Sequence, residues 1–312
     1  MSLPSARIAL LMTVPPLLWA GNAVVGRLMV GQVPPLTLNA LRWSLAFLLL
    51  LPLGWRVLRE PRDLKTRWRH LLLLGTLGVG MYNAFQYLAL VSSTPINVTL
   101  IAASMPVWML AVGALFYGVQ PQRRQIAGAA LSLAGVALVI ARGDPAALAR
   151  VHFVAGDFYI VIAIIAWSFY SWMLARPPAN LQGDGQPRVQ DGAASRPWDW
   201  SETLLVQVLF GLVFALGAGG LEQATGAADI RWSGAVVAAL AYVAIGPAFI
   251  AYRCWGLGVS LGGPALAAFF SNLTPVFAAL LSAALLGEWP QWYHGVAFGL
   301  IVAGIVVSSA RR

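Results

Sequence analysis

Apolar residues dominate the chain in ten long runs, each about the length of a helix that crosses a bilayer. A helix needs about 20 mostly apolar residues to cross ~30 Å of hydrocarbon. Reading from each polar break to the next gives the runs 7–30, 36–58, 70–91, 95–117, 124–142, 156–176, 202–221, 234–257, 264–286 and 289–309. This pattern predicts an all-α integral membrane protein with ten transmembrane helices. A signal peptide is the alternative for the first run, but Arg7 is its only basic residue upstream and no small-residue cleavage site follows.

The composition excludes several classes of protein. The chain has 312 residues, of which 59% are hydrophobic and 10% charged, and its mean hydropathy is +0.76. Soluble domains are about half apolar and about a quarter charged, so a soluble enzyme, a disordered protein and a secreted module are excluded. The single cysteine, Cys254, excludes a disulfide framework and a cysteine-based zinc site. We expect no metal and no cofactor.

The net charge of +9 is explained by membrane topology. With the N-terminus placed in the cytoplasm, 14 of the 20 Lys and Arg residues fall in cytoplasmic loops and three fall in outside loops. The remaining three, Arg27, Arg42 and Arg253, lie within the apolar runs. This bias follows the positive-inside rule and predicts that both termini are cytoplasmic. The charge therefore requires no nucleic-acid partner.

The two halves of the chain repeat each other. A constant offset of 169 aligns residues 95–135 with 264–304, and it pairs prolines and glycines without a gap: Pro95 with Pro264, Pro106 with Pro275, Gly118 with Gly287, Pro121 with Pro290 and Gly135 with Gly304. We predict a first half over 1–150, a second half over 151–312, and a flexible cytoplasmic linker over 177–201. Five spans per half invert the second half in the membrane, and inverted repeats are typical of secondary transporters.

Polar, aromatic and proline residues recur in the middle of the runs. Such residues are costly in lipid, so they face protein or a water-filled cavity. Each tryptophan could instead be a packing residue, but asparagine and tyrosine on the same faces favour a cavity. The predicted substrate-binding residues are Trp19, Asn22, Tyr82, Asn83, Gln86, Trp108, Trp167, Tyr170, Ser171, Tyr242 and Asn272, and the predicted hinges are Pro15, Pro106, Pro247 and Pro275.

The predicted cavity is nearly uncharged. All eleven carboxylates and all three histidines fall in loops or at the ends of runs, and a proton-coupled cation antiporter generally needs a carboxylate within the membrane. Arg42 lies about six residues into the second run. Its side chain either extends to the headgroups or meets an anionic group of the substrate, and it is included among the predicted binding residues.

The fifth run of each half carries small residues at helical spacing: Gly128, Ser132 and Gly135 in one, and Gly295, Gly299 and Ala303 in the other. Small residues let helices approach closely in membranes. We expect these runs to be scaffold, in a monomer or a weak homodimer.

Several motifs resemble the EamA-type drug/metabolite transporter superfamily over essentially the whole chain. They are Leu18-Trp19-Ala20-Gly21-Asn22, Pro34-Pro35 followed by Leu41-Arg42-Trp43, Pro106, Pro275-Val276-Phe277, and Leu286-Gly287-Glu288. The resemblance implies ten helices, cytoplasmic termini and export of small metabolites across the bacterial inner membrane. It also implies a cavity lined by the first four helices of each half. The aromatic lining is most similar to the YddG-type exporters of aromatic and other amino acids, although Arg27 stands where many members have a lysine.

These observations predict an alternating-access exporter of amino acids, aromatic ones included, that works by facilitated diffusion. Its partners would be a small-molecule substrate and membrane lipids. Export of another metabolite or of a hydrophobic drug is the alternative within this class, because the fold does not fix the substrate. A membrane enzyme would need a His/Asp/Glu cluster, and a channel would need charge rings or filter loops. Neither feature is visible in the sequence.

Overall fold

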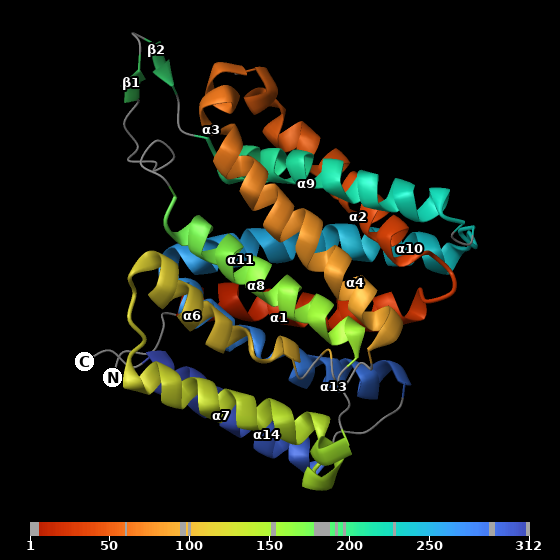
Figure 1. The fold of residues 1–312 in the computed structure, drawn as a ribbon, viewed down its shortest axis with the longest axis vertical. Helices are drawn as coiled ribbons and strands as arrows, with labels where there is room; N and C mark the ends of the chain where they lie inside the picture. Colours follow the sequence, from red (N-terminus) through yellow and green to blue (C-terminus); the bar gives the residue numbers. More distant parts are fainter. Residues whose placement is uncertain are drawn as a thin grey trace.

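The structure is a computed structural model that describes residues 6–59, 61–93, 98, 101–150, 154–177, 188–190, 193–195, 198–226, 229–286 and 291–309. These residues are nearly all helical (Figure 1). The α-helices are α1 (Ala6–Leu28), α2 (Pro35–Gly54), α3 (Pro61–Leu74), α4 (Tyr82–Ser92), α6 (Met105–Tyr117), α7 (Arg123–Ile140), α8 (Ala155–Ala175), α9 (Trp200–Ala224), α10 (Gly234–Val243), α11 (Ala251–Gly262), α12 (Pro264–Ser271), α13 (Thr274–Leu286) and α14 (Trp292–Ser309). The shorter elements are the 3-10 helices η1 (Trp55–Arg59) and η3 (Pro145–Arg150), the π-helices η2 (Gly75–Met81) and η5 (Ala244–Ile250), and the strands β1 (Arg188–Gln190) and β2 (Ala193–Ser195).

Six helical stretches in the described residues are long and apolar enough to cross a membrane. They are Ala6–Gly26, Pro35–Arg59, Arg67–Ala89, Ala155–Ala175, Trp200–Ala224 and Gly234–Gly262, and three shorter apolar helices cover Met105–Tyr117, Pro264–Ala278 and Trp292–Ser308. The predicted all-helical, multi-pass membrane architecture is therefore confirmed. The count of ten spans stays a prediction.

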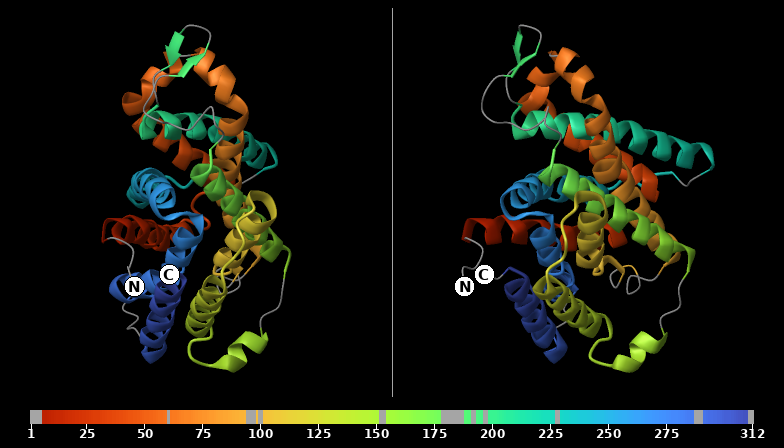
Figure 2. Two further views of the ribbon diagram at one scale, coloured as in Figure 1. Left: turned by 90° about the vertical axis from the view of Figure 1, so that its left-hand side faces the viewer. Right: turned by 60° about the vertical axis from the view of Figure 1, so that its left-hand side comes forward.

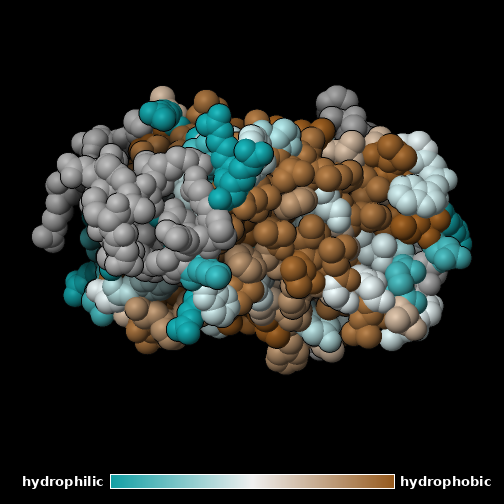
Figure 3. Space-filling model, turned by 90° about the horizontal axis from the view of Figure 1, so that it is seen from above, coloured by the Kyte–Doolittle hydropathy of each residue, from teal (hydrophilic) through white to brown (hydrophobic). Residues whose placement is uncertain are grey.

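The outer surface of the bundle is apolar. On α2, Leu45, Leu48 and Leu49 are exposed, whereas Ala46 and Leu50 of the same helix are buried in the core. A helix that is apolar on all sides belongs in a large core or in lipid. On the face that Figure 3 shows, brown, apolar side chains cover the middle, and teal, hydrophilic side chains lie toward the left and right edges. This distribution fits a bilayer around the middle of the bundle.

The second half reproduces the elements of the first at an offset of 169 residues. The 13-residue helix α6 corresponds to α13, the 18-residue helix α7 corresponds to α14, and the 7-residue π-helix η2 corresponds to η5. In each pair the second element begins 169 residues after the first: α13 at 274 and α6 at 105, α14 at 292 and α7 at 123, and η5 at 244 and η2 at 75. The gapless offset found in the sequence therefore extends to the ends of the helices themselves.

Two pairs of matched spans are irregular in the same way. The third and eighth spans each contain a π-helix, and a π-bulge is rare and often marks a functional site. The ninth span is broken between α12 and α13 by a turn at Asn272 and Leu273, and its counterpart has a turn at Ala103 and Ser104 before α6. Pro106 and Pro275 follow these turns within the first residues of α6 and α13, where a proline costs no helical hydrogen bond.

The paired helices α7 and α14 pack along each other at one edge of the bundle (Figures 1 and 2). A Cβ atom on Gly128 would lie 2.6 Å from the Gly304 carbonyl oxygen, and one on Gly135 would lie 2.8 Å from that of Ala297. The predicted small-residue face of α7 is thus a helix contact. On α14, Gly295 and Gly299 have no atom within 4 Å of a Cβ position, so these two glycines do not take part in the contact with α7.

The beginning of α1, the end of α14 and the β1–β2 hairpin lie at the same end of the bundle (Figure 1). The hairpin is antiparallel, with Arg188 opposite Ser195, and it lies within the predicted linker 177–201. The helix after the linker begins at Trp200, two residues before the predicted run, because Asp199 caps it. The Asp199 carboxylate accepts hydrogen bonds from the Ser201 and Glu202 amides at 2.7 and 3.0 Å, and the Glu202 carboxylate accepts from the Asp199 amide at 2.9 Å.

Candidate functional site

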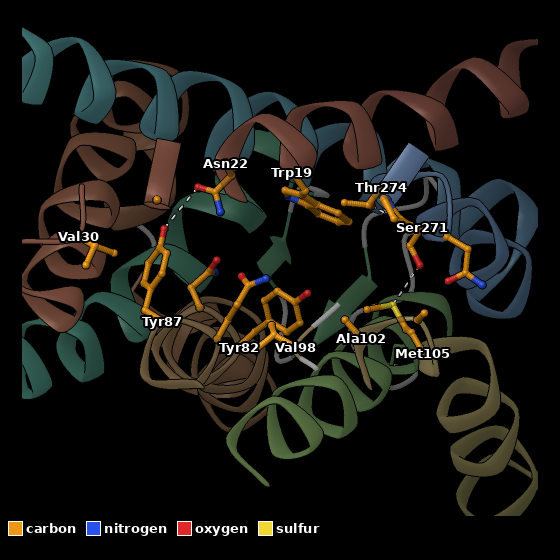
Figure 4. Close-up of a pocket in the computed structure, with 16 residues that line it drawn as sticks. Trp19, Asn22, Val30, Tyr82, Tyr87, Val98, Ala102, Met105, Ser271 and Thr274 are labelled. Carbon is orange, nitrogen blue, oxygen red and sulfur yellow. Dashed lines mark hydrogen bonds between the residues drawn. The ribbon is translucent and has the colours of Figure 1, made fainter. Parts of the chain in front are cut away.

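A cavity of about 210 Å³ lies between α1, α4 and the two broken spans (Figure 4). Its wall combines three aromatic side chains, six side chains with amide or aliphatic hydroxyl groups, and apolar residues. None of its described lining residues carries a carboxylate. The lining residues are Trp19, Asn22, Gly26, Val30, Tyr82, Asn83, Gln86, Tyr87, Val98, Ala102, Ala103, Met105, Ser271, Asn272, Thr274 and Pro275.

The helix break in the ninth span explains the polar side of the cavity. Ser271 ends α12, and Thr274 begins α13, so both side chains lie where the backbone leaves the regular helix. The two hydroxyls donate to the carbonyls of Ala268 and Ser271 at 2.6 and 2.7 Å. Asn272 is 2% exposed, and its Nδ2 atom has no hydrogen-bond partner in the described part of the chain. A buried amide without a partner is a donor that a bound solute can use.

A cluster of aromatic rings lies against one side of the cavity. Trp167 of α8 is 1% exposed and is its centre. Its ring contacts Trp19 at 5.3 Å and Tyr82 at 4.8 Å between centroids, and both of these residues line the cavity. The same ring contacts three more buried aromatic side chains, Tyr170, Tyr252 and Trp255, at 4.9, 5.3 and 5.4 Å. We call these six residues the aromatic cluster.

The aromatic cluster ties the two halves of the chain together. The Trp19 indole donates to the carbonyl of Pro247 at 3.3 Å, within the π-helix η5. The Tyr252 hydroxyl donates to the Gly78 carbonyl within the matched π-helix η2. In a π-helix the backbone carbonyls do not follow the usual α-helical hydrogen-bond pattern. Here two carbonyls of π-helices accept hydrogen bonds from aromatic residues of the cluster.

A polar network lies behind another part of the cavity wall. Arg42 of α2 donates from Nη1 to the Asn83 side-chain oxygen at 2.7 Å and to the Tyr87 hydroxyl at 3.4 Å. Tyr87 donates to the Asn22 side-chain oxygen at 3.4 Å (Figure 4). Asn83 donates from Nδ2 to the Tyr252 hydroxyl at 3.3 Å. Asn22, Asn83 and Tyr87 line the cavity, so this network connects the wall to the guanidinium.

A second hollow of about 410 Å³ continues from the cavity, and the two share Gly26, Val30 and Tyr87. Its other lining residues include the α1–α2 connection, Glu222 near the end of α9, and Asp229. The α1–α2 connection and the end of α9 lie on the side of the molecule away from the two termini (Figure 1). Glu222 accepts from the backbone amides of Leu36 and Thr37 at 3.0 and 2.7 Å and so caps the start of α2. We call this hollow the vestibule.

The structure places six of the predicted binding residues on the cavity wall: Trp19, Asn22, Tyr82, Asn83, Gln86 and Asn272. Arg42, Trp167 and Tyr170 lie behind the wall and are almost fully buried, with Arg42 0% exposed. Ser171 is also buried, and it accepts from the Trp255 indole at 3.1 Å. Their roles toward a substrate stay predictions.

Two predicted binding residues lie away from the cavity. The Trp108 indole donates to the Ser104 hydroxyl at 3.1 Å, which holds its ring along its own helix. The Tyr242 hydroxyl donates to the Leu18 carbonyl at 3.0 Å, and its ring packs over Gly21. Neither ring is among the residues that line the cavity, and the roles predicted for them toward a substrate stay predictions. Of the predicted hinges, Pro275 lines the cavity and Pro15 lies buried inside the unbroken helix α1.

Some lining residues were missed by the sequence analysis. Tyr87 is the most informative, because its spacing of four from Asn83 places both on one face of α4. Trp255 belongs to the aromatic cluster and does not line the cavity. It was missed as well, because it lies near the end of its predicted run, where tryptophan is common at a membrane interface. Among the described residues, no group of three or more His, Cys, Asp or Glu side chains could hold a metal ion.

A multi-pass helical bundle with matched broken spans around a small polar and aromatic cavity has the architecture of a secondary transporter. The sequence pattern of the EamA-like transporter family matches residues 6–141 and 192–310. The chain therefore belongs to the EamA-like transporter family, which confirms the resemblance seen in the motifs.

Related proteins are membrane transporters rather than enzymes. The chain is 28% identical to "Aromatic amino acid exporter YddG" of Ancylobacter novellus, over 95% of each chain. It is 26% identical to "Probable amino-acid metabolite efflux pump" of Salmonella typhimurium, over 99% of this chain and 95% of that one. It is 25% identical to "Uncharacterized transporter" of Archaeoglobus fulgidus, over 99% of each. A solved crystal structure matches 98% of this chain and 97% of its own with a TM-score of 0.74 at 24% identity, which shows a common fold.

Proposed function

We propose that this protein is an inner-membrane exporter of amino acids, aromatic ones included, which works by alternating access and facilitated diffusion. The observation that carries the proposal is the composition of the cavity wall. Trp19 and Tyr82 offer aromatic surface for an apolar side chain, and Asn22, Gln86 and Asn272 offer amide groups for the polar end. Ligand sites commonly combine apolar surface with a few polar groups that fix orientation.

The size of the cavity supports a small solute. Pockets for drug-sized ligands have volumes of about 300–1,000 Å³, whereas this cavity has about 210 Å³. The cavity accommodates a solute of amino-acid size, and the vestibule next to it adds about 410 Å³. Relatives named as an aromatic amino acid exporter and a probable amino-acid metabolite efflux pump support the same substrate class.

The arrangement of the cavity suggests how alternating access would work. On one side the cavity continues into the vestibule, and on another side the aromatic cluster packs against its wall. We assign this conformation to the outward-facing state. In the inward-facing state, the rings of Trp19 and Trp167 would separate. The broken spans and the two π-helices would bend, because their backbone is already outside the regular helical pattern.

Facilitated diffusion is proposed because the described lining residues contain no carboxylate. A proton-coupled carrier generally needs an ionisable group that a proton can reach within the membrane. The net flow of a neutral amino acid would then follow its own concentration gradient.

Counterflow in proteoliposomes tests the proposal. Vesicles preloaded with excess unlabelled phenylalanine are offered labelled phenylalanine, tryptophan, methionine, threonine or alanine in turn. A carrier exchanges the label saturably, and we expect aromatic labels to enter faster than alanine. Linear, non-saturable entry would indicate a channel. Entry of none of these labels, together with exchange of another metabolite or of a drug, would refute amino acids as the substrate class.

A further inference from the structure

Arg42 carries a charge that the described part of the protein does not neutralise. Its side chain is fully buried in the middle of α2. No carboxylate among the described residues is hydrogen-bonded to it, and its Nε and Nη2 atoms have no hydrogen-bond partner there. Its Nη1 atom is satisfied only by neutral acceptors, the Asn83 amide oxygen and the Tyr87 hydroxyl.

Such an arrangement is costly, so it calls for an explanation. Arginine is effectively always protonated in proteins, so the charge persists. Burial of a charge without an opposite charge is strongly unfavourable, and ionisable residues within a membrane mark substrate pathways by default. The Arg42 side chain does not extend to the headgroups, as the alternative in the sequence analysis required, because its guanidinium is held by two side chains that line the cavity.

We propose that Arg42 is the specificity-determining residue of this transporter, and that it selects substrates that carry a carboxylate. The inference rests on the proposed function and narrows its substrate class. In the structure the Asn83 amide oxygen lies 2.7 Å from Nη1 and accepts one of the hydrogen bonds that the guanidinium can donate. A substrate carboxylate takes over that position when the Asn83 and Tyr87 side chains turn aside. It also uses the Nη2 donor, because guanidinium and carboxylate groups pair through two parallel hydrogen bonds.

The rest of the cavity fits this orientation. The lining residues offer a substrate ammonium group only neutral acceptors, such as the amide oxygens of Asn22 and Asn272. A cation without a carboxylate would therefore lie near an uncompensated positive charge and gain no opposite charge from the wall. The inference predicts that amino acids and other carboxylic acids are carried, and that amines, amides and esters of the same shape are excluded.

The test compares phenylalanine with phenylalaninamide and phenethylamine as competitors of labelled phenylalanine in counterflow. For the wild-type protein we expect phenylalanine to compete about 10- to 100-fold better than either analogue, the range of a hydrogen bond between charged groups. In Arg42→Gln we expect this preference to fall to within about threefold. Arg253→Gln is the matched control. It removes an arginine that packs on Trp200 and does not line the cavity, so the preference should stay at the wild-type value.

A second variant keeps the test valid if Arg42→Gln does not fold. Asn83→Asp places a carboxylate where the amide oxygen lies 2.7 Å from the guanidinium. We expect this variant to melt at a higher temperature than the wild type and to lose its preference for the carboxylate. A residue that is merely structural would also give the higher melting temperature, but it would leave the preference unchanged.

The outcomes separate this inference from the proposed function. If the wild-type protein exchanges amino acids, and both Arg42→Gln and Asn83→Asp keep the preference for phenylalanine over its amide, the role of Arg42 is refuted alone. If the wild-type protein exchanges no amino acid, the proposed function is refuted first.

Discussion

Trp167 offers the sharpest test of how the aromatic cluster is held together. Its ring is 1% exposed and contacts five other aromatic rings at centroid distances of 4.8–5.4 Å. Replacing a buried tryptophan with alanine costs about 3–5 kcal/mol. The indole N–H of Trp167, however, has no hydrogen-bond partner among the described residues. The stabilisation therefore comes from the ring and not from the N–H group.

This distinction predicts that two substitutions of Trp167 change the free energy of unfolding by different amounts. Trp167→Phe leaves a cavity, which at ~24 cal/mol per Å³ costs about 1 kcal/mol for every ~40 Å³. It also removes a buried donor without a partner, which relieves about 1–3 kcal/mol. The two effects nearly cancel, so we expect Trp167→Phe to change the free energy of unfolding by less than about 1 kcal/mol. Trp167→Ala keeps the relief of the N–H but loses the whole ring, so we expect a net loss of about 2–4 kcal/mol.

Thermal unfolding of the purified protein in detergent measures the difference. A change of 1 kcal/mol shifts Tm by about 2 °C in a large chain. The two variants differ by at least about 1 kcal/mol, so we expect Trp167→Ala to melt at least about 2 °C below Trp167→Phe. Trp292→Ala is the control, because Trp292 is 66% exposed and its loss should change stability by less than about 0.5 kcal/mol. Both Trp167 variants lose the indole N–H, but only Trp167→Ala loses the whole ring. Equal destabilisation would refute the reasoning, because it would mean that a paired N–H, and not the ring, provides the stabilisation.

Three further predictions address the cavity and its packing. Trp19→Ala should reduce the preference of counterflow for phenylalanine over alanine by about 2- to 10-fold, the range of one aromatic contact, and an unchanged ratio would remove Trp19 from the binding surface. Gly78→Ala should destabilise the protein by about 1–3 kcal/mol, because its Cβ would lie 2.6 Å from the Tyr170 ring. Gly220→Ala, with open space around its Cβ, should be neutral or stabilising, so equal melting of the two variants would contradict the packing described. An imposed pH gradient should change counterflow of a neutral amino acid by less than about twofold, and accumulation driven by the gradient would refute facilitated diffusion.

Much of the fold could be predicted because a membrane imposes simple rules on the sequence. Long apolar runs predict spanning helices. The matched residues Pro106 and Pro275 predicted irregular backbone in their spans, and in the structure each lies at the start of a helix after a turn. The π-helices could not be predicted in the same way. Pro247 disturbs one of them, but its counterpart η2 contains glycines and no proline, and apolar periodicity does not distinguish a π-turn from an α-turn.

The cavity was harder to predict than the fold. Helical periodicity places residues on one face, and so Asn22, Asn83 and Asn272 were selected with good reason. Periodicity does not say which neighbour a face meets. Trp167 therefore looked like a lining residue although it lies one layer deeper, and Trp108 looked the same although Ser104 holds its ring along α6. A mid-span aromatic residue gives the same signal in the sequence whether it packs or binds.

Protection of a single cysteine tests the central claim, that this cavity is the substrate site, most directly. Cys254 is the sole cysteine of the chain, so Cys254→Ser provides a background for Ala102→Cys on the cavity wall and for Trp232→Cys as an exposed control. A charged thiol reagent is added from outside to vesicles that hold each variant, with and without saturating phenylalanine. We predict that phenylalanine slows labelling at position 102 and leaves labelling at position 232 unchanged. Labelling at position 102 that proceeds at the same rate with any amino acid the protein transports would contradict the account.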